Sequence, residues 1–97
     1  MRQQRGKPVT SDALEQLTEM MLRHCGPLFG KIVFASSGSE AIEGTMKVAL
    51  QYWTARGRAR KRRFIARERS YHGSTLGALS MSGFAERRKP FVQSLLD

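Results

Sequence analysis

The sequence predicts an α/β fold built on a βαβ unit, with two parallel strands and flanking helices. Residues 31–35 form a short apolar run rich in β-branched and aromatic residues, and 63–67 form a second candidate strand. Segments with helical spacing lie before, between and after these runs. The order helix, strand, helix, strand, helix favours a parallel pair of strands joined by a crossover helix.

The first helix is expected over 12–25, after a polar lead at residues 1–10. Asp12 and Glu15 resemble a capping box, with Ser11 just before them. Apolar residues then recur at helical spacing, which indicates an amphipathic helix. Gly26 and Pro27 are expected to end it. The apolar positions are Leu14, Leu17, Met21 and Cys25.

The remaining elements follow from the alternation of apolar runs and turns. A second helix is expected from Glu40 to about Ala55, and a third from Ser74 or Thr75 to Ser82. Gly83 suits a left-handed position at the end of that third helix. The tail, 84–97, is expected to be irregular, with a short turn near Pro90. Residues 11–97 are therefore interpreted as one partial α/β domain.

Composition restricts the possible classes of function. The 97 residues suffice for one small domain, and no apolar run approaches the roughly 18 residues that a bilayer span needs. The N-terminus lacks the apolar stretch of a secretory signal, and the single cysteine, Cys25, favours a reduced, cytoplasmic setting. No metal-ligand pattern is identified.

The net charge of +9 is unusual for so short a chain. One explanation is an anionic partner, which leaves a small basic nucleic-acid-binding module without catalysis as the alternative function. The largest cluster lies in the turn 56–63, where no aromatic residue is interleaved for base stacking. A solvated crossover turn is the preferred interpretation. The cluster comprises Arg56, Arg58, Arg60, Lys61, Arg62 and Arg63.

The turn Ser36–Ser39 lies between the first candidate strand and the second helix. The first N–H groups of a helix have no partner within it, and their dipoles favour an anion. Gly38 permits close approach of a phosphate, and the Ser39 hydroxyl adds a donor. A simple capping box, Ser37 with Glu40, is the alternative. The turn matches neither a Walker loop nor a hydrolase elbow.

The loop Ser70–Gly73 also follows a candidate strand and precedes a helix. Ligands of open α/β sheets bind outside the carboxyl ends of the strands, so this loop and the turn at 36–39 are expected at one edge. Tyr71 could stack on a flat ligand, and His72 could form a hydrogen bond. The alternatives are a partly buried ring and a histidine that bonds only to backbone.

Taken together, the two loops resemble class III aminotransferases of fold type I. The stretches VFASSGSEAIEGTMKVALQYW and FIARERSYHGSTLGALSMSG carry the resemblance, with the tail Arg87–Leu96. It extends from Ile32 to about Leu96, roughly two thirds of the chain. It implies a partial cofactor-binding large domain over 11–97 and pyridoxal 5′-phosphate as the cofactor. It also implies an amino donor, a keto acid or aldehyde acceptor, and a homodimer, with no specific nucleic-acid partner and no membrane partner.

The resemblance implies roles for four cofactor-binding residues. Gly38 and Ser39 would bind the phosphate, Tyr71 would stack on the pyridine ring, and His72 would support the loop or lie near the ring. Glu40 would be structural. An aminomutase of the same family would use the same pocket.

The resemblance also implies that two catalytic groups are absent. No lysine of this chain matches the family's Schiff-base lysine, and no acid matches the partner of the pyridinium nitrogen. The chain is therefore expected to be inactive alone and to have no catalytic residue of its own. Its lysines are Lys7, Lys31, Lys47, Lys61 and Lys89.

Overall fold

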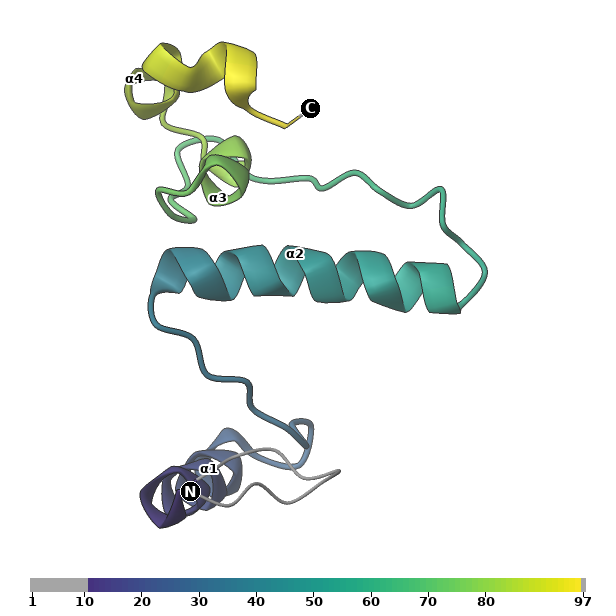
Figure 1. Cartoon of the computed structure of the whole chain (residues 1–97), viewed down its shortest axis with the longest axis vertical. Coiled ribbons are helices and arrows are strands. Elements are labelled where there is room, and N and C mark those ends of the chain that lie inside the picture. Colours follow the sequence, from purple (N-terminus) through teal and green to yellow (C-terminus); the bar gives the residue numbers. More distant parts are fainter. Residues whose placement is uncertain (1–10, 97) are drawn as a thin grey trace, which may run out of the picture. The chain divides into compact units, whose positions relative to one another are not determined.

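The computed structural model describes residues 11–96, so the polar lead expected at 1–10 lies outside the described residues. The described elements are all helical: α1 (Asp12–Cys25), α2 (Gly38–Ala55), α3 (Leu76–Met81), α4 (Ala85–Arg88) and the 3₁₀ helix η1 (Lys89–Ser94) (Figure 1). The chain divides into two compact units, with the boundary between Val33 and Phe34. The first unit contains α1, and the second contains all the other helices.

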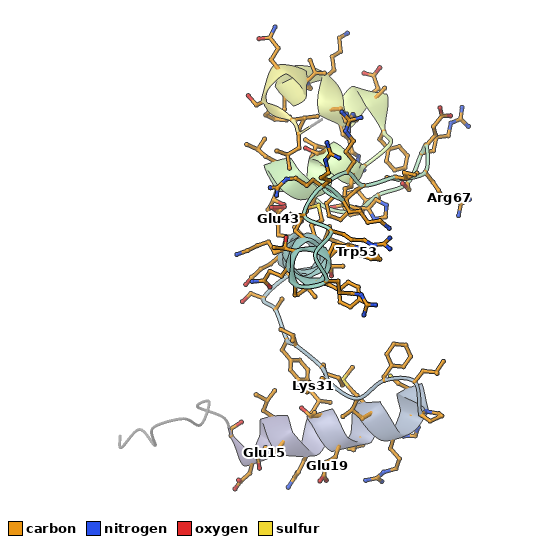
Figure 2. All side chains as sticks on the ribbon, turned by 90° about the vertical axis from the view of Figure 1, so that its right-hand side faces the viewer. Glu15, Glu19, Lys31, Glu43, Trp53 and Arg67 are labelled. Atoms are coloured by element: carbon orange, nitrogen blue, oxygen red, sulfur yellow. The ribbon has the colours of Figure 1, made fainter. Side chains whose placement is uncertain are left out.

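Helix α1 has the bounds that its apolar spacing predicts. Its cap is Ser11, whose Oγ accepts a hydrogen bond from Leu14 N–H at 3.2 Å, one residue before the Asp12 that the sequence pattern indicates. Gly26, at φ 90°, ends the helix. Glu15 and Glu19 project from one side of α1 (Figure 2), as their spacing of four residues requires. No residue of α1 is buried.

Helix α2 begins two residues earlier than expected and ends at Ala55 as expected. Ser37 Oγ accepts from Glu40 N–H at 3.1 Å, which caps the helix. The Glu40 carboxylate accepts from Ser36 N–H at 3.2 Å, one residue before the position of an ideal capping box. Of the two bonds of the predicted capping box, the one from Glu40 N–H to Ser37 Oγ is therefore confirmed.

Neither expected strand is formed, so the βαβ unit is not confirmed. Residues 31–35 and 63–67 have irregular backbone, and the second segment returns as an extended trace alongside α2 (Figure 1). A strand exists only where a second strand satisfies its backbone groups. Among residues 11–96 neither segment has such a partner, although both have the composition of strands.

The C-terminal elements are more regular than expected. Helix α3 lies against the N-terminal half of α2, and α4 and η1 replace the irregular tail (Figure 1). The expectation for Gly83 is wrong: α3 ends at Ser82 in an extended conformation, and Gly83 is not among the glycines with positive φ. Glycine at this position instead allows the backbone of residues 67–69 to pass close by, because a Cβ there would meet Arg67 O at 2.8 Å.

The core of the second unit is small and lies where α3 meets α2. The buried side chains are Met46, Ala78, Leu79 and Ser82. Many large apolar residues stay exposed, including Ile65, which is fully exposed, and Phe91. No helix among the described residues is long and apolar enough to cross a membrane.

Candidate functional site

The turn before α2 leaves two backbone donors at the start of the helix. Glu40 N–H bonds to Ser37 Oγ, and Ala41 N–H bonds to the Ser37 carbonyl at 3.0 Å. The N–H groups of Gly38 and Ser39 have no partner among the described residues. A Cβ on Gly38 would meet nothing within 4 Å, so no described atom lies close to the turn on that side. Helix capping and anion binding are therefore compatible at this turn.

The turn and the loop after residue 69 are in direct contact. Ser74 N–H donates to Ser39 Oγ at 2.8 Å, although the two residues are 35 positions apart in the chain. Gly73 lies at φ 140°, and a Cβ there would lie 2.6 Å from Ser39 Oγ and 2.7 Å from Ala78 Cβ. The expectation that the two loops lie together is confirmed, even though the sheet on which it was based is not formed.

Tyr71 presents an aromatic ring beside this contact. Its side chain is 53% exposed, and its hydroxyl forms a hydrogen bond of 3.1 Å with Ser74 Oγ. The Arg87 guanidinium lies over the ring, 5.2 Å from its centroid, as a cation–π pair. Tyr71 is thus fixed at its hydroxyl to the same residue that contacts Ser39.

His72 is half-buried and belongs to the support of the loop. Its Nε2 lies 3.2 Å from Ser70 Oγ, and its backbone N–H donates to Ser82 Oγ at 2.9 Å. Both bonds tie the imidazole and its backbone to neighbouring protein groups. Whether His72 supports the loop or lies near the cofactor ring, as the resemblance implies, stays a prediction.

A second tie joins α3 to α2. Thr75 Oγ1 caps α3 by accepting from Ala78 N–H at 3.4 Å, and it donates to Glu43 Oε2 at 3.1 Å. The Glu43 carboxylate lies between the two helices (Figure 2), where a Cβ on Gly77 would collide with it. Gly77 therefore lets the carboxylate reach the start of α3.

Three polar residues of this site were not predicted from the sequence. Ser74, Glu43 and Ser82 act through contacts between segments far apart in the chain, which helical spacing does not report. Ser74 carried one signal, because it follows Gly73 at the expected start of a helix. No group of acidic, histidine or cysteine side chains able to hold a metal ion occurs within residues 11–96.

The family model for class-III aminotransferases matches residues 6–96 of the chain. The chain belongs to the class-III aminotransferase family. It is 48% identical over 83 residues to the uncharacterized aminotransferase YodT of Bacillus subtilis, covering 86% of this chain and 19% of that protein. It is 40% identical over 82 residues to the probable gamma-aminobutyrate transaminase 3, mitochondrial, of Oryza sativa, covering 84% and 16%.

A third relative of this class-III aminotransferase chain is the omega-aminotransferase of Caulobacter vibrioides. The identity is 44% over 61 residues, which cover 63% of this chain and 14% of that protein. The chain thus spans less than a fifth of the length of these curated relatives. No solved structure matches it significantly.

Proposed function

We propose that this chain supplies part of the cofactor pocket of a pyridoxal-phosphate-dependent transaminase. The whole enzyme would transfer an amino group from an amino donor to a keto acid or aldehyde, as a homodimer in the cytoplasm. Gly38 and Ser39 would hold the cofactor phosphate, and Tyr71 would stack on its ring. The chain alone would have no transaminase activity. Its membership of the class-III family supports this proposal, whereas nothing in the comparisons supports a nucleic-acid-binding module.

The hydrogen bond from Ser74 N–H to Ser39 Oγ carries the proposal. It brings the candidate phosphate turn and the candidate stacking loop together within one short polar network. That network continues from Ser74 Oγ to the Tyr71 hydroxyl. A ligand that carries a phosphate group on an aromatic ring through one methylene needs both features, an anion site and an aromatic surface beside it.

The residues present are chemically suited to pyridoxal phosphate. Helix α2 has 18 residues, so its dipole adds to the two unpartnered N–H groups at its start. The carboxylate of Glu40, which would repel a phosphate, is bonded to Ser36 N–H. Half of the Tyr71 side chain is exposed and can contact a ring.

When bound, pyridoxal phosphate supplies an electron-withdrawing ring that stabilises negative charge on the amine-bearing carbon. In this proposal the chain's own residues bind the cofactor and orient its ring. The Gly38 and Ser39 N–H groups donate to phosphate oxygens, Tyr71 limits the tilt of the ring, and His72 holds the loop. Lys61, by contrast, lies 3.9 Å over the Trp53 ring near the far end of α2, and no catalytic lysine is assigned.

The test is a titration of the purified chain with pyridoxamine 5′-phosphate, followed by amide NMR. This probe carries an amine in place of the aldehyde, so it cannot form imines with surface lysines. We expect shifts of the Gly38 and Ser39 amides with this probe and with inorganic phosphate, and shifts of the Tyr71 ring protons with this probe that excess inorganic phosphate reverses. Ser39→Ala keeps the backbone N–H but removes the hydroxyl, which accepts from Ser74 N–H and would also donate to the phosphate. It should weaken binding about tenfold, the effect of one hydrogen bond to a charged group.

Thr45→Ala is the matched control, because Thr45 lies on the same helix and its hydroxyl donates only to the Ala41 carbonyl, at 2.8 Å. It should bind the probe as the wild type does. Equal loss in the two variants, or probe-induced shifts confined to the basic turn 56–63, would contradict the proposed site. A transaminase assay of the chain alone should give no turnover.

A further inference from the structure

We infer that Ser82 is a positioning residue for the cofactor loop, whose buried hydroxyl holds the His72 backbone and thereby fixes the direction of the Tyr71 ring. This inference rests on the proposed function, in which Tyr71 stacks on the cofactor. Ser82 is at the end of α3, ten residues beyond His72, and has no predicted role in binding.

The hydroxyl of Ser82 both donates and accepts a hydrogen bond. It donates to the Ala78 carbonyl at 3.1 Å and accepts from His72 N–H at 2.9 Å. Only 3% of the residue is exposed, so water cannot replace either partner. A hydroxyl has one hydrogen to donate and two lone pairs to accept with. Because the Ser82 hydrogen is used within α3, its oxygen can accept from a donor outside the helix.

A second bond fixes the other side of Tyr71. Gly83 N–H donates to the Ser70 carbonyl at 2.8 Å, and Arg69 N–H donates to the Gly83 carbonyl at 3.3 Å. The residues before and after Tyr71 are therefore both bonded to the segment that ends α3. With its backbone held at Ser70 and His72, Tyr71 has little freedom in the direction of its Cα–Cβ bond.

The residues around Tyr71 are thus held by Ser82, by Gly83 and, at the tyrosine hydroxyl, by Ser74. The bond from Ser74 N–H to Ser39 Oγ also joins the loop to the turn. Of these, only the Ser82 bond uses a buried side chain. Removing its oxygen would leave His72 N–H without a partner inside the protein, which favours movement of the loop toward water. The phosphate turn contacts Ser74 rather than Ser82, so it should not move with it.

Ser80 provides a matched control on the same helix. Its hydroxyl donates to the Leu76 carbonyl at 2.7 Å, as that of Ser82 does to Ala78, but it accepts from Leu96 N–H at 2.8 Å. A serine that served only the helix would behave alike at both positions. The two residues differ in whether they hold the tyrosine loop.

The experiment compares the wild type with Ser82→Ala, Ser82→Thr, Ser82→Cys and Ser80→Ala. Inorganic phosphate and pyridoxamine 5′-phosphate are the probes, and the Tyr71 β-proton couplings are measured in the free chain. In Ser82→Ala we expect phosphate affinity within twofold of the wild type. The preference for pyridoxamine 5′-phosphate over phosphate should fall about tenfold, and the β-proton couplings should become averaged.

Ser82→Thr retains the oxygen and should restore both readouts, and Ser80→Ala should match the wild type. Ser82→Cys keeps the side-chain size without a strong acceptor, and it should resemble the alanine variant, which keeps the test decisive if Ser82→Ala unfolds. Equal loss of both affinities, or unchanged couplings in Ser82→Ala and Ser82→Cys, would overturn the inference. Failure of the wild type to prefer pyridoxamine 5′-phosphate would refute the proposed function instead, and the couplings would still decide whether Ser82 orients Tyr71.

Discussion

At the scale of the residue, Gly73 determines how closely the two loops approach. Its φ of 140° lies in a region that side chains disfavour, and a Cβ would meet Ser39 Oγ at 2.6 Å and Ser39 Cα at 2.9 Å. Any side chain would therefore strain the backbone and also separate Ser39 from Ser74. The contact that supports the proposed function exists because this position is glycine.

Gly73→Ala should accordingly destabilise the second unit by about 1–3 kcal/mol, the usual cost of a strained backbone position. It should also remove the protection of the Ser74 amide against hydrogen exchange. Thermal unfolding followed by circular dichroism and amide exchange measure the two effects.

Gly44→Ala is the control, because Gly44 lies within α2 and a Cβ there would meet nothing within 4 Å. That change should stabilise the helix by about 1 kcal/mol, and the same loss in both variants would argue against a special role for Gly73.

The sequence predicted single residues well where the determining interaction is local. Ser37 caps α2 through a bond three residues away, and the Gly26–Pro27 pair ends α1 where expected. Gly83 was assigned the wrong role because its environment is set by residues 67–69, which approach it from a distant part of the chain. Ser82 was missed for the same reason, since its partner His72 lies in another loop.

At the scale of the element, helices and strands differ in what a sequence can report. The hydrogen bonds of α1 and α2 lie within each helix, so spacing and caps predicted their bounds to within two residues. The segments 31–35 and 63–67 need partners elsewhere, and composition alone does not supply them. The two candidate loops nevertheless lie together as expected, because the Ser39–Ser74 contact needs only the ends of two helices.

Helix α3 shows how a very short helix is held in place. Six residues are too few for a stable isolated helix. Arg88 Nη1 donates to the carbonyls of Leu79, Ser80 and Ser82 at 3.0, 2.8 and 2.9 Å, at the helix end where carbonyls lack donors from a further turn. The Leu79 carbonyl also accepts from Ser82 N–H at 3.0 Å. A positive charge at this end also suits the helix dipole. Arg88 therefore links α4 to α3 and supports the loop that carries Tyr71.

Arg88→Ala should destabilise α3 by about 2 kcal/mol, as expected for the loss of charged hydrogen bonds to a helix end. Faster amide exchange across Leu79–Gly83 is the measurement. Arg88→Lys should recover only part of the loss, because an ammonium group lacks the planar geometry of the guanidinium. Lys89→Ala removes the neighbouring exposed cation and should leave exchange in α3 unchanged. If both alanine variants changed it equally, net charge rather than capping would be responsible.

At the scale of the whole molecule, many more large apolar side chains are exposed than are buried in the core. Val33 is 92% exposed and Ile65 fully exposed, and both belong to segments with strand-like composition. The chain spans less than a fifth of its curated relatives' length. A βαβ arrangement of these segments therefore stays a prediction, since each segment would need a neighbouring strand to satisfy its backbone groups.

The charge of the molecule is concentrated in the turn 56–63, which contains six basic residues and no acid. Two of the cations lie over aromatic rings of α2: Arg56 is 5.4 Å from the Tyr52 centroid, and Lys61 is 3.9 Å from that of Trp53. The turn itself contains no aromatic residue on which a base could stack. This arrangement favours a solvated basic turn over a surface that recognises nucleic-acid sequence.

Binding of the chain to oligonucleotides should therefore be nonspecific and electrostatic. The logarithm of the affinity should fall linearly with the logarithm of salt concentration, with a slope near −0.7 per phosphate contact for single strands. Two oligonucleotides of unrelated sequence should bind equally, as measured by fluorescence anisotropy from low to physiological salt. Replacing Arg58, Arg60 and Arg62 by Gln should flatten the slope by about two units, since each of the three lost contacts contributes about 0.7 to the slope. The same triple variant should bind pyridoxamine 5′-phosphate as the wild type does, because that site is proposed at the opposite end of α2.

Strong sequence preference that persists at high salt would instead favour a nucleic-acid-binding module, with the basic turn as part of its recognition surface.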